Sequence, residues 1–129
     1  MTHVVIRLDL SPRGRIGPGK VALLEQIGAT GSISAAGRAL GMSYRRTWLL
    51  VEELNLLFKE PVVNAHPGGA GGGGTALTAF GRRLVADYRA IEAAAQAQAG
   101  ARLAALEAAL AAEDDLPEAE RSSWRPRGG

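Results

Sequence analysis

The chain has 129 residues, no cysteine, two histidines and a formal net charge of +2. A chain of this length can bury a core without disulfides or a structural metal, and the lack of cysteine excludes disulfides and thiolate metal sites. No apolar run reaches the ~18 residues of a membrane span, and the N-terminus lacks the pattern of a secretory signal. We therefore expect a cytoplasmic protein with no membrane partner.

Charge is unevenly distributed along the chain. Residues 1–91 carry eleven Lys/Arg and six Asp/Glu, a net charge of +5, whereas residues 92–129 carry four and seven, a net charge of −3. A basic body with an acidic C-terminal segment is typical of a domain that binds a polyanion.

The N-terminal residues predict a strand followed by a helix. Residues 4–10, VVIRLDL, alternate apolar and polar side chains, which is the pattern of a half-buried strand. Residues 11–19 are rich in glycine and proline and predict a connector. Residues 20–30 predict a helix, because Pro18 suits its first turn and Gly31 its C-terminal end.

Two further helices are predicted on either side of a glycine. Ser32 or Ser34 can cap a short helix, which Gly41 ends. Ser43 can cap the next helix, residues 44–58. This arrangement favours a helix-turn-helix, which needs a glycine at the turn.

The first of these two helices also has the small surface that a helix-turn-helix requires. Ala36 and Gly37 let the second helix pack closely across the first. Leu40 and Met42, which flank the turn, are expected to contact the core.

Beyond the third helix the pattern changes to two strands, residues 62–66 and 75–78, joined by the glycine-rich segment 67–74. Glycine permits a tight hairpin tip and a close approach of the backbone to a partner. Thr78 can then cap a long helix over residues 79–115. The predicted fold class is mainly α with a small β-hairpin: a winged helix-turn-helix followed by a long C-terminal helix.

The predicted elements divide the chain into three parts. We assign residues 1–91 to a winged helix-turn-helix DNA-binding domain, residues 92–115 to a C-terminal extension of the long helix that could serve dimerisation, and residues 116–129 to a disordered tail. In the extension, the spacing i, i+3, i+7 could form a dimer seam or pack back on the same chain. The leucines with this spacing are Leu103, Leu106 and Leu110.

The helix over residues 44–58 has two distinct faces when projected at about 100° per residue. The face predicted to be core consists of Tyr44, Thr47, Val51, Leu54 and Phe58, with Trp48 and Asn55 at its border. The opposite side carries Arg45, Leu49, Glu52 and Leu56, with Arg46 beside them. Arginine at the N-terminal end of such a helix can bind guanine O6/N7 or a phosphate. We predict that Arg45 and Arg46 read or grip DNA; the alternative is two solvated arginines on a surface helix.

Other motifs do not support catalysis or cofactor binding. The segment GAGGGG, residues 69–74, matches G-x-G-x-x-G in letters but is followed by a predicted strand rather than a helix. His66 has no nucleophile or carboxylate near it in sequence, and we expect it to contact solvent or a phosphate. We therefore expect no enzyme activity, no cofactor and no metal.

Five short motifs follow one another in the first two thirds of the chain: GSIS at 31–34, GMSYRRTW at 41–48, ELN at 53–55, GGAGGGG at 68–74 and LTAFGRRL at 77–84. With these motifs, residues 20–91 resemble the N-terminal DNA-binding domain of molybdate-responsive, ModE-type bacterial regulators. That domain is in turn similar to the winged helix of LysR-type regulators.

The resemblance implies a transcription factor that binds a palindromic operator in double-stranded DNA as a homodimer. It implies that the start of the recognition helix meets the major groove, that the wing meets the backbone or minor groove, and that residues 4–10 and 79–112 form the dimer contact. Full-length members carry C-terminal oxyanion-binding modules, for which this chain has no room, so we expect no oxyanion ligand on it.

The predicted DNA-contacting residues come from the two helices of the helix-turn-helix and from the wing. They are Ser32, Ser34, Ser43, Tyr44, Arg45, Arg46, Trp48, Leu49, Glu52, His66, Gly71, Gly72, Gly73 and Thr75. Because the wing has no Arg or Lys, an alternative function is a dimerising protein-interaction module, or antagonist, that keeps the fold but binds DNA weakly.

Overall fold

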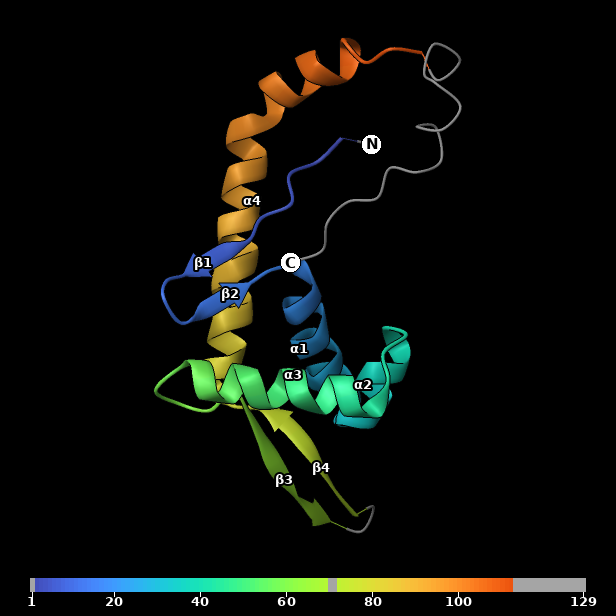
Figure 1. The fold of residues 1–129 in the computed structure, drawn as a ribbon, viewed down its shortest axis with the longest axis vertical. Coiled ribbons are helices and arrows are strands. Elements are labelled where there is room, and N and C mark those ends of the chain that lie inside the picture. Colours follow the sequence, from blue (N-terminus) through green and yellow to red (C-terminus); the bar gives the residue numbers. More distant parts are fainter. Residues whose placement is uncertain (1, 70–71, 113–129) are drawn as a thin grey trace.

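The computed structural model describes residues 2–69 and 72–112, with the backbone alone for residues 66–69 and 72–73. The elements in chain order are β1 (Leu8–Leu10), β2 (Gly14–Ile16), α1 (Pro18–Thr30), α2 (Ile33–Ala39), α3 (Tyr44–Leu57), β3 (Val63–Gly69), β4 (Gly72–Leu77) and α4 (Ala79–Ala108). Figure 1 shows α1, α2 and α3 gathered together, with the β3–β4 hairpin projecting from one end and α4 running away from the other. The predicted fold class, a winged helix-turn-helix followed by a long helix, is confirmed.

The N-terminal region departs from the prediction. The strand expected over residues 4–10 is limited to β1, and the segment expected to be a connector contains β2, which pairs with β1 antiparallel. A turn closed by the backbone bond from Arg13 N to Leu10 O (2.9 Å) joins the two strands. Ile16 anchors this hairpin because it is completely buried in the core. A three-residue strand beside glycines gives no periodic signal, so the pairing was not visible in the sequence.

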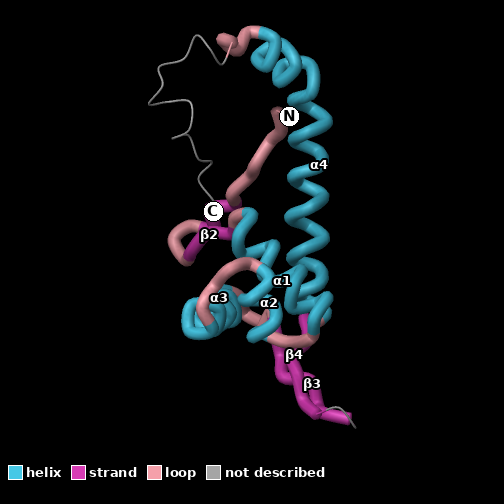
Figure 2. Tube along the Cα trace, turned by 90° about the vertical axis from the view of Figure 1, so that its right-hand side faces the viewer, coloured by secondary structure: helices cyan, strands magenta, loops and turns pink. Residues whose placement is uncertain are grey.

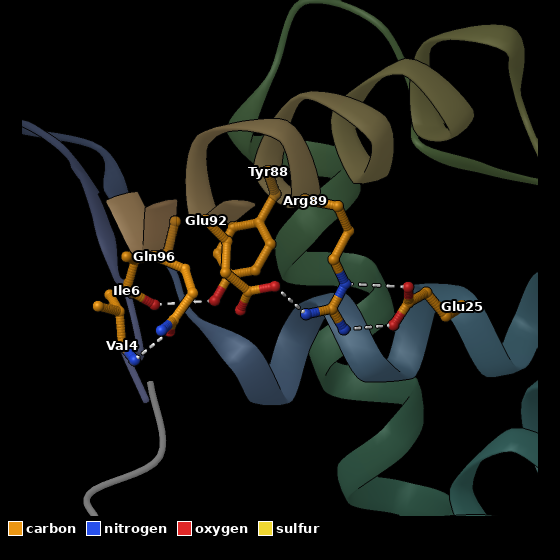
Figure 3. A network of polar contacts seen from close by, with 7 residues as sticks. All are labelled: Val4, Ile6, Glu25, Tyr88, Arg89, Glu92 and Gln96. Atoms are coloured by element: carbon orange, nitrogen blue, oxygen red, sulfur yellow. Dashed lines mark hydrogen bonds and ion pairs between the residues drawn. The ribbon is translucent and has the colours of Figure 1, made fainter. Parts of the chain in front are cut away.

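Residues 4–7 run beside α4 without strand pairing, as Figures 1 and 3 show. Two hydrogen bonds attach them to the helix: the hydroxyl of Tyr88 donates to the carbonyl oxygen of Ile6 (2.8 Å), and the N–H of Val4 donates to Gln96 Oε1 (2.7 Å). Tyr88 is fully buried, and this desolvation raises the pKa of its hydroxyl. The phenol therefore acts as a neutral donor that fixes the N-terminal segment on α4.

Helix α1 begins and ends as predicted. Pro18 lies in its first turn, and Gly31 at its C-terminal end has a φ of 69°, a left-handed conformation that glycine adopts without strain. The face with Val21, Leu24 and Ile27 is buried, as expected. Leu23 is buried as well, because α1 is contacted by α2, α4, β2 and β4 and thus lies at the centre of the domain.

The close approach of α2 to α3 is confirmed. A Cβ added to Gly37 would collide with Oγ1 of Thr47 and crowd the Cβ and Cγ2 atoms of the same residue. Gly37 and Thr47 are both buried. Gly41, at the turn, has a φ of 68°. Leu40 is 36% exposed and contributes little to the core, contrary to the prediction.

One hydrophobic core joins the helices to the base of the wing. Its buried members are Ile16, Val21, Leu23, Leu24, Ile27, Ala36, Val51, Leu54, Val62, Val63, Leu84 and Tyr88. Phe58, predicted to be core, is partly buried at its edge, where its ring packs edge-to-face on Phe80 at a centroid distance of 5.1 Å.

Helix α4 begins at the predicted cap and ends earlier than expected. Thr78 Oγ1 accepts a hydrogen bond from Gly81 N (2.9 Å), and the helix stops at Ala108. The last residues of the predicted helix, 113–115, and the predicted tail, 116–129, lie outside the described residues.

An ion-pair network fixes α4 on α1 (Figure 3). The guanidinium of Arg89 binds both carboxylate oxygens of Glu25 (2.6 and 3.1 Å) and one oxygen of Glu92 (2.8 Å). The hydrogen bond from Arg89 holds the pKa of Glu25 below its usual range, and the two carboxylates raise the pKa of Arg89. Bidentate pairing of this kind constrains orientation as well as distance, so together with the buried Leu84 and Tyr88 it contributes to the orientation of α4 on α1.

Candidate nucleic-acid interface

The N-terminal end of α3 is built by local hydrogen bonds. Ser43 Oγ accepts from the N–H of Arg46 (3.1 Å), which confirms Ser43 as the cap. The hydroxyl of Thr47 donates to the carbonyl oxygen of Ser43 (2.7 Å). These bonds fix the first turn, from which Arg45 and Arg46 project into solvent.

The inward face of α3 agrees with the helical projection except at its start. Thr47, Val51 and Leu54 are buried, whereas Tyr44, predicted to be core, is 62% exposed. Because Thr47 sits directly against Gly37, the two helices approach too closely at this end to admit an aromatic ring between them. Tyr44 is therefore displaced to the surface, where it lies one turn before the 45% exposed ring of Trp48.

The outward face of α3 combines cationic and apolar side chains. Arg45, Arg46, Leu49 and Glu52 are all exposed, and Leu49 is 54% exposed. Beside them is a shallow hollow of about 350 Å³, lined by Ser43, Arg45, Arg46, Leu49, Leu50 and Glu53. Neither arginine forms a hydrogen bond or ion pair through its side chain with a described residue, so both guanidinium groups are available to a ligand.

The two adjacent glutamates of α3 differ in their surroundings. Glu53 forms an ion pair with Lys20 of α1 (3.1 Å), and the same ammonium group donates to the carbonyl oxygen of Arg15 in β2 (2.8 Å). Glu53 therefore helps to hold the recognition helix against the rest of the domain. Glu52 has no such partner among the described residues.

Asn55 fixes the wing to the end of α3. Its side-chain oxygen accepts from the N–H groups of Val62 (2.7 Å) and Val63 (3.0 Å), and its amide nitrogen donates to the carbonyl oxygen of Val63 (3.1 Å). Thr78 supports the other strand by donating to the carbonyl oxygen of Pro61 (2.7 Å). The sequence placed Asn55 only at the border of the core, since nothing local shows its bonds to the strand.

The wing consists of β3 and β4, paired antiparallel, with Val63 opposite Leu77 and Ala65 opposite Thr75. Its base contacts the turn before α2 through a bond from Thr75 N to the carbonyl oxygen of Gly31 (2.9 Å). A Cβ at Gly74 would lie 2.5 Å from that same oxygen, so the close approach requires glycine there. Figure 2 shows the hairpin projecting beyond the three short helices, at the end of the molecule opposite the tip of α4.

Three other residues predicted to contact DNA have hydroxyl groups that are bonded or buried within the domain. Ser32 caps α2 by accepting from Ala35 N (3.0 Å), and Ser34 accepts from the guanidinium of Arg38 (2.9 Å), so both hydroxyls have partners within the domain. The hydroxyl of Thr75 is buried without a hydrogen-bond partner, so it does not face solvent in this structure.

The predicted wing residues are placed only in part. The backbone of His66 lies in β3, while the position of its side chain is outside what the structure describes. Gly72 and Gly73 lie in β4, and Gly71 is outside the described residues.

Within residues 2–69 and 72–112 no helix combines the length and apolarity needed to cross a bilayer. Nor do the described residues contain a group of three or more His, Cys, Asp or Glu placed to hold a metal ion.

The region that contains this interface is similar in sequence to known proteins. No protein-family model matches the chain. It is 54% identical over 79 residues to the molybdenum-pterin-binding protein MopB of Rhodobacter capsulatus, a match that covers 61% of this chain and 29% of that protein. The matched part of the chain is a ModE-like region.

Two regulators extend the comparison of this ModE-like region. The chain is 40% identical over 86 residues to the transcriptional regulator ModE of Yersinia pestis and 35% identical over 86 residues to the DNA-binding transcriptional dual regulator ModE of Escherichia coli (strain K12). Each match covers 67% of this chain and 33% of the relative. The family resemblance drawn from the five motifs is confirmed, while the chain spans about a third of the length of the relatives it matches.

Proposed function

We propose that the ModE-like region binds double-stranded DNA with α3 in the major groove, and that the chain acts as a transcriptional regulator. The observation that carries the proposal is the pair Arg45 and Arg46, exposed and free of ion-pair partners among the described residues. The opposite face of the same helix is held in the core by Thr47, Val51 and Leu54. A rigid helix with available arginines at its N-terminal end is suited to major-groove binding.

We further propose that the chain is a homodimer on a palindromic operator. Figures 1 and 2 show α4 extending past the other helices, with the N-terminal segment as its companion among the described residues. Large apolar side chains are exposed on the N-terminal segment, on α4 and just beyond its end: Val5 (49%), Ile91 (46%), Leu106 (64%) and Leu110 (70%). A second copy would cover them and place two recognition helices on one duplex.

Sedimentation tests the dimer directly. The full chain should sediment as a dimer at micromolar concentration, whereas truncation after Gln98, which keeps Tyr88, Arg89 and Gln96, should give a monomer. A monomer in both cases would reject the dimer, and an unchanged dimer after truncation would show that the C-terminal part of α4 is not its contact.

DNA binding is tested by titrating the chain with labelled duplex over a series of salt concentrations. We expect affinity that falls steeply with salt, because each neutralised phosphate releases counterions. We expect no effect of added molybdate, because Arg45 and Arg46 lie on an open helix surface rather than in an enclosed oxyanion site. Absence of binding at low salt would favour the interaction-module alternative.

A further inference from the structure

The outward face of α3 carries a carboxylate among the groups proposed to contact DNA. Arg45, Leu49 and Glu52 are three exposed residues in line on this face, opposite the buried face of Thr47 and Leu54. We call these three residues the reading stripe. A negative charge in such a stripe is unfavourable near a phosphate backbone unless a donor on the DNA compensates it.

Glu52 differs from the neighbouring Glu53 in whether its negative charge is balanced within the domain. The carboxylate of Glu53 is bound by Lys20 at 3.1 Å, so its charge is balanced within the domain. Glu52 has no hydrogen bond or ion pair with a described residue and is exposed. Its carboxylate would therefore meet the DNA with its charge uncompensated.

Each base pair presents one exocyclic amino donor in the major groove, N4 of cytosine or N6 of adenine. The N6 group lies between two acceptors that repel a carboxylate, adenine N7 and thymine O4, whereas N4 has an acceptor, guanine O6, on one side only. Glutamate therefore accepts best from cytosine N4. Arg45 and Glu52 are seven residues apart, a rise of about 10 Å along the helix, which corresponds to about three base-pair steps of ~3.4 Å. Leu49, between them and 54% exposed, can contact a thymine methyl group.

Resting on the DNA-binding function proposed above, we propose that Glu52 is a specificity-determining residue of the reading stripe. It selects cytosine about three base pairs from the base that Arg45 contacts. It also weakens binding to every sequence that offers an acceptor at that position. Specificity at this base pair thus comes from a repulsive element as well as from a hydrogen bond.

The test compares Glu52→Gln with Glu53→Gln on the full chain. Each protein selects duplexes from a pool with randomised half-sites, and affinities are then measured on the selected and on a scrambled duplex. For Glu52→Gln we expect cytosine to be lost at one position of each half-site, in favour of adenine, whose N6 and N7 suit an amide. We also expect tighter binding to the scrambled duplex and about a tenfold smaller ratio of selected to scrambled affinity.

Glu53→Gln is the matched control: because Glu53 holds α3 through Lys20, its replacement should change the affinity for all duplexes alike and leave the selected sequence unchanged. An unchanged cytosine preference in Glu52→Gln, or an equal loss of affinity for all duplexes, would overturn the role of Glu52 while leaving DNA binding intact. If the wild-type chain binds no duplex at low salt, the proposed function itself fails and this inference fails with it.

Discussion

Replacing Asn55 with alanine should destabilise the domain and detach the wing from α3. The side chain of Asn55 makes three hydrogen bonds to the backbone of Val62 and Val63, at 2.7, 3.0 and 3.1 Å. Val62 is completely buried and Val63 is 4% exposed. Two N–H groups would therefore lose their partner in a place where water replaces it poorly.

The expected loss of unfolding free energy follows from the number of hydrogen bonds that Asn55 makes. At about 1 kcal/mol for each hydrogen bond, the variant loses about 3 kcal/mol of unfolding free energy, and more where the freed amides stay dry. This is a large fraction of the ~5–15 kcal/mol that stabilises a typical domain. The melting temperature should fall by about 10 °C.

Urea unfolding followed by circular dichroism measures the change, with Asn64→Ala as the control. Asn64 follows Val63 in β3, is exposed, and makes no side-chain hydrogen bond to a described residue; its replacement should change the free energy of unfolding by less than about 0.5 kcal/mol. If Asn55→Ala is no less stable than Asn64→Ala, the wing is not held by Asn55 and the reasoning is wrong.

Two further changes test the packing and the ion pairs. Gly37→Ala should cost about 1–3 kcal/mol, because the added methyl collides with Thr47; Gly100→Ala, where nothing lies within 4 Å, should be neutral or stabilising, and equal effects of the two would contradict the close α2–α3 contact. Because Arg89 lowers the pKa of Glu25, the stability from this pair is complete above the ordinary glutamate pKa of about 4.3 and is lost as the pH falls through the lowered value. On acidification, the free energy of unfolding should accordingly fall further in the wild type than in Glu25→Gln. The difference should be less than about 1 kcal/mol, since both side chains are about 40% exposed. Identical dependence of this free energy on pH in the two proteins would contradict the pair's contribution.

The features predicted correctly from the sequence are those determined by residues close together in the chain. Pro18 and Gly31 mark the two ends of α1, and Ser43 and Thr78 cap α3 and α4 within three residues of the groups they bind. Helical periodicity likewise placed the arginines of α3 on its outward face. Local chemistry and period are sufficient for the order of the helices and of the wing strands in this fold, although not for β2.

Apart from the short β1–β2 hairpin and the end of α4, the features that were missed depend on contacts between different elements. The contact of Arg89 with Glu25 joins residues 64 positions apart, and that of Lys20 with Glu53 joins residues 33 apart. The exposure of Tyr44 follows from the packing of Thr47 on Gly37, which one helix alone does not reveal. A projection onto a single helix shows which side is apolar, but the neighbouring helix decides how much of that side is covered.

The salt dependence of DNA binding in Arg45→Ala and Arg46→Ala tests the central proposal most directly. Arg102→Ala is the control, since Arg102 is exposed on α4 and forms no ion pair with a described residue. If Arg46 holds phosphate, its loss from both copies of a dimer should make the slope of log affinity against log salt shallower by about 2 on every duplex. If Arg45 reads a base, its loss should cost about 1–3 kcal/mol on the selected site and little on a scrambled one. Affinities and slopes equal to those of the Arg102→Ala control would contradict the assignment of α3 as the DNA-reading helix.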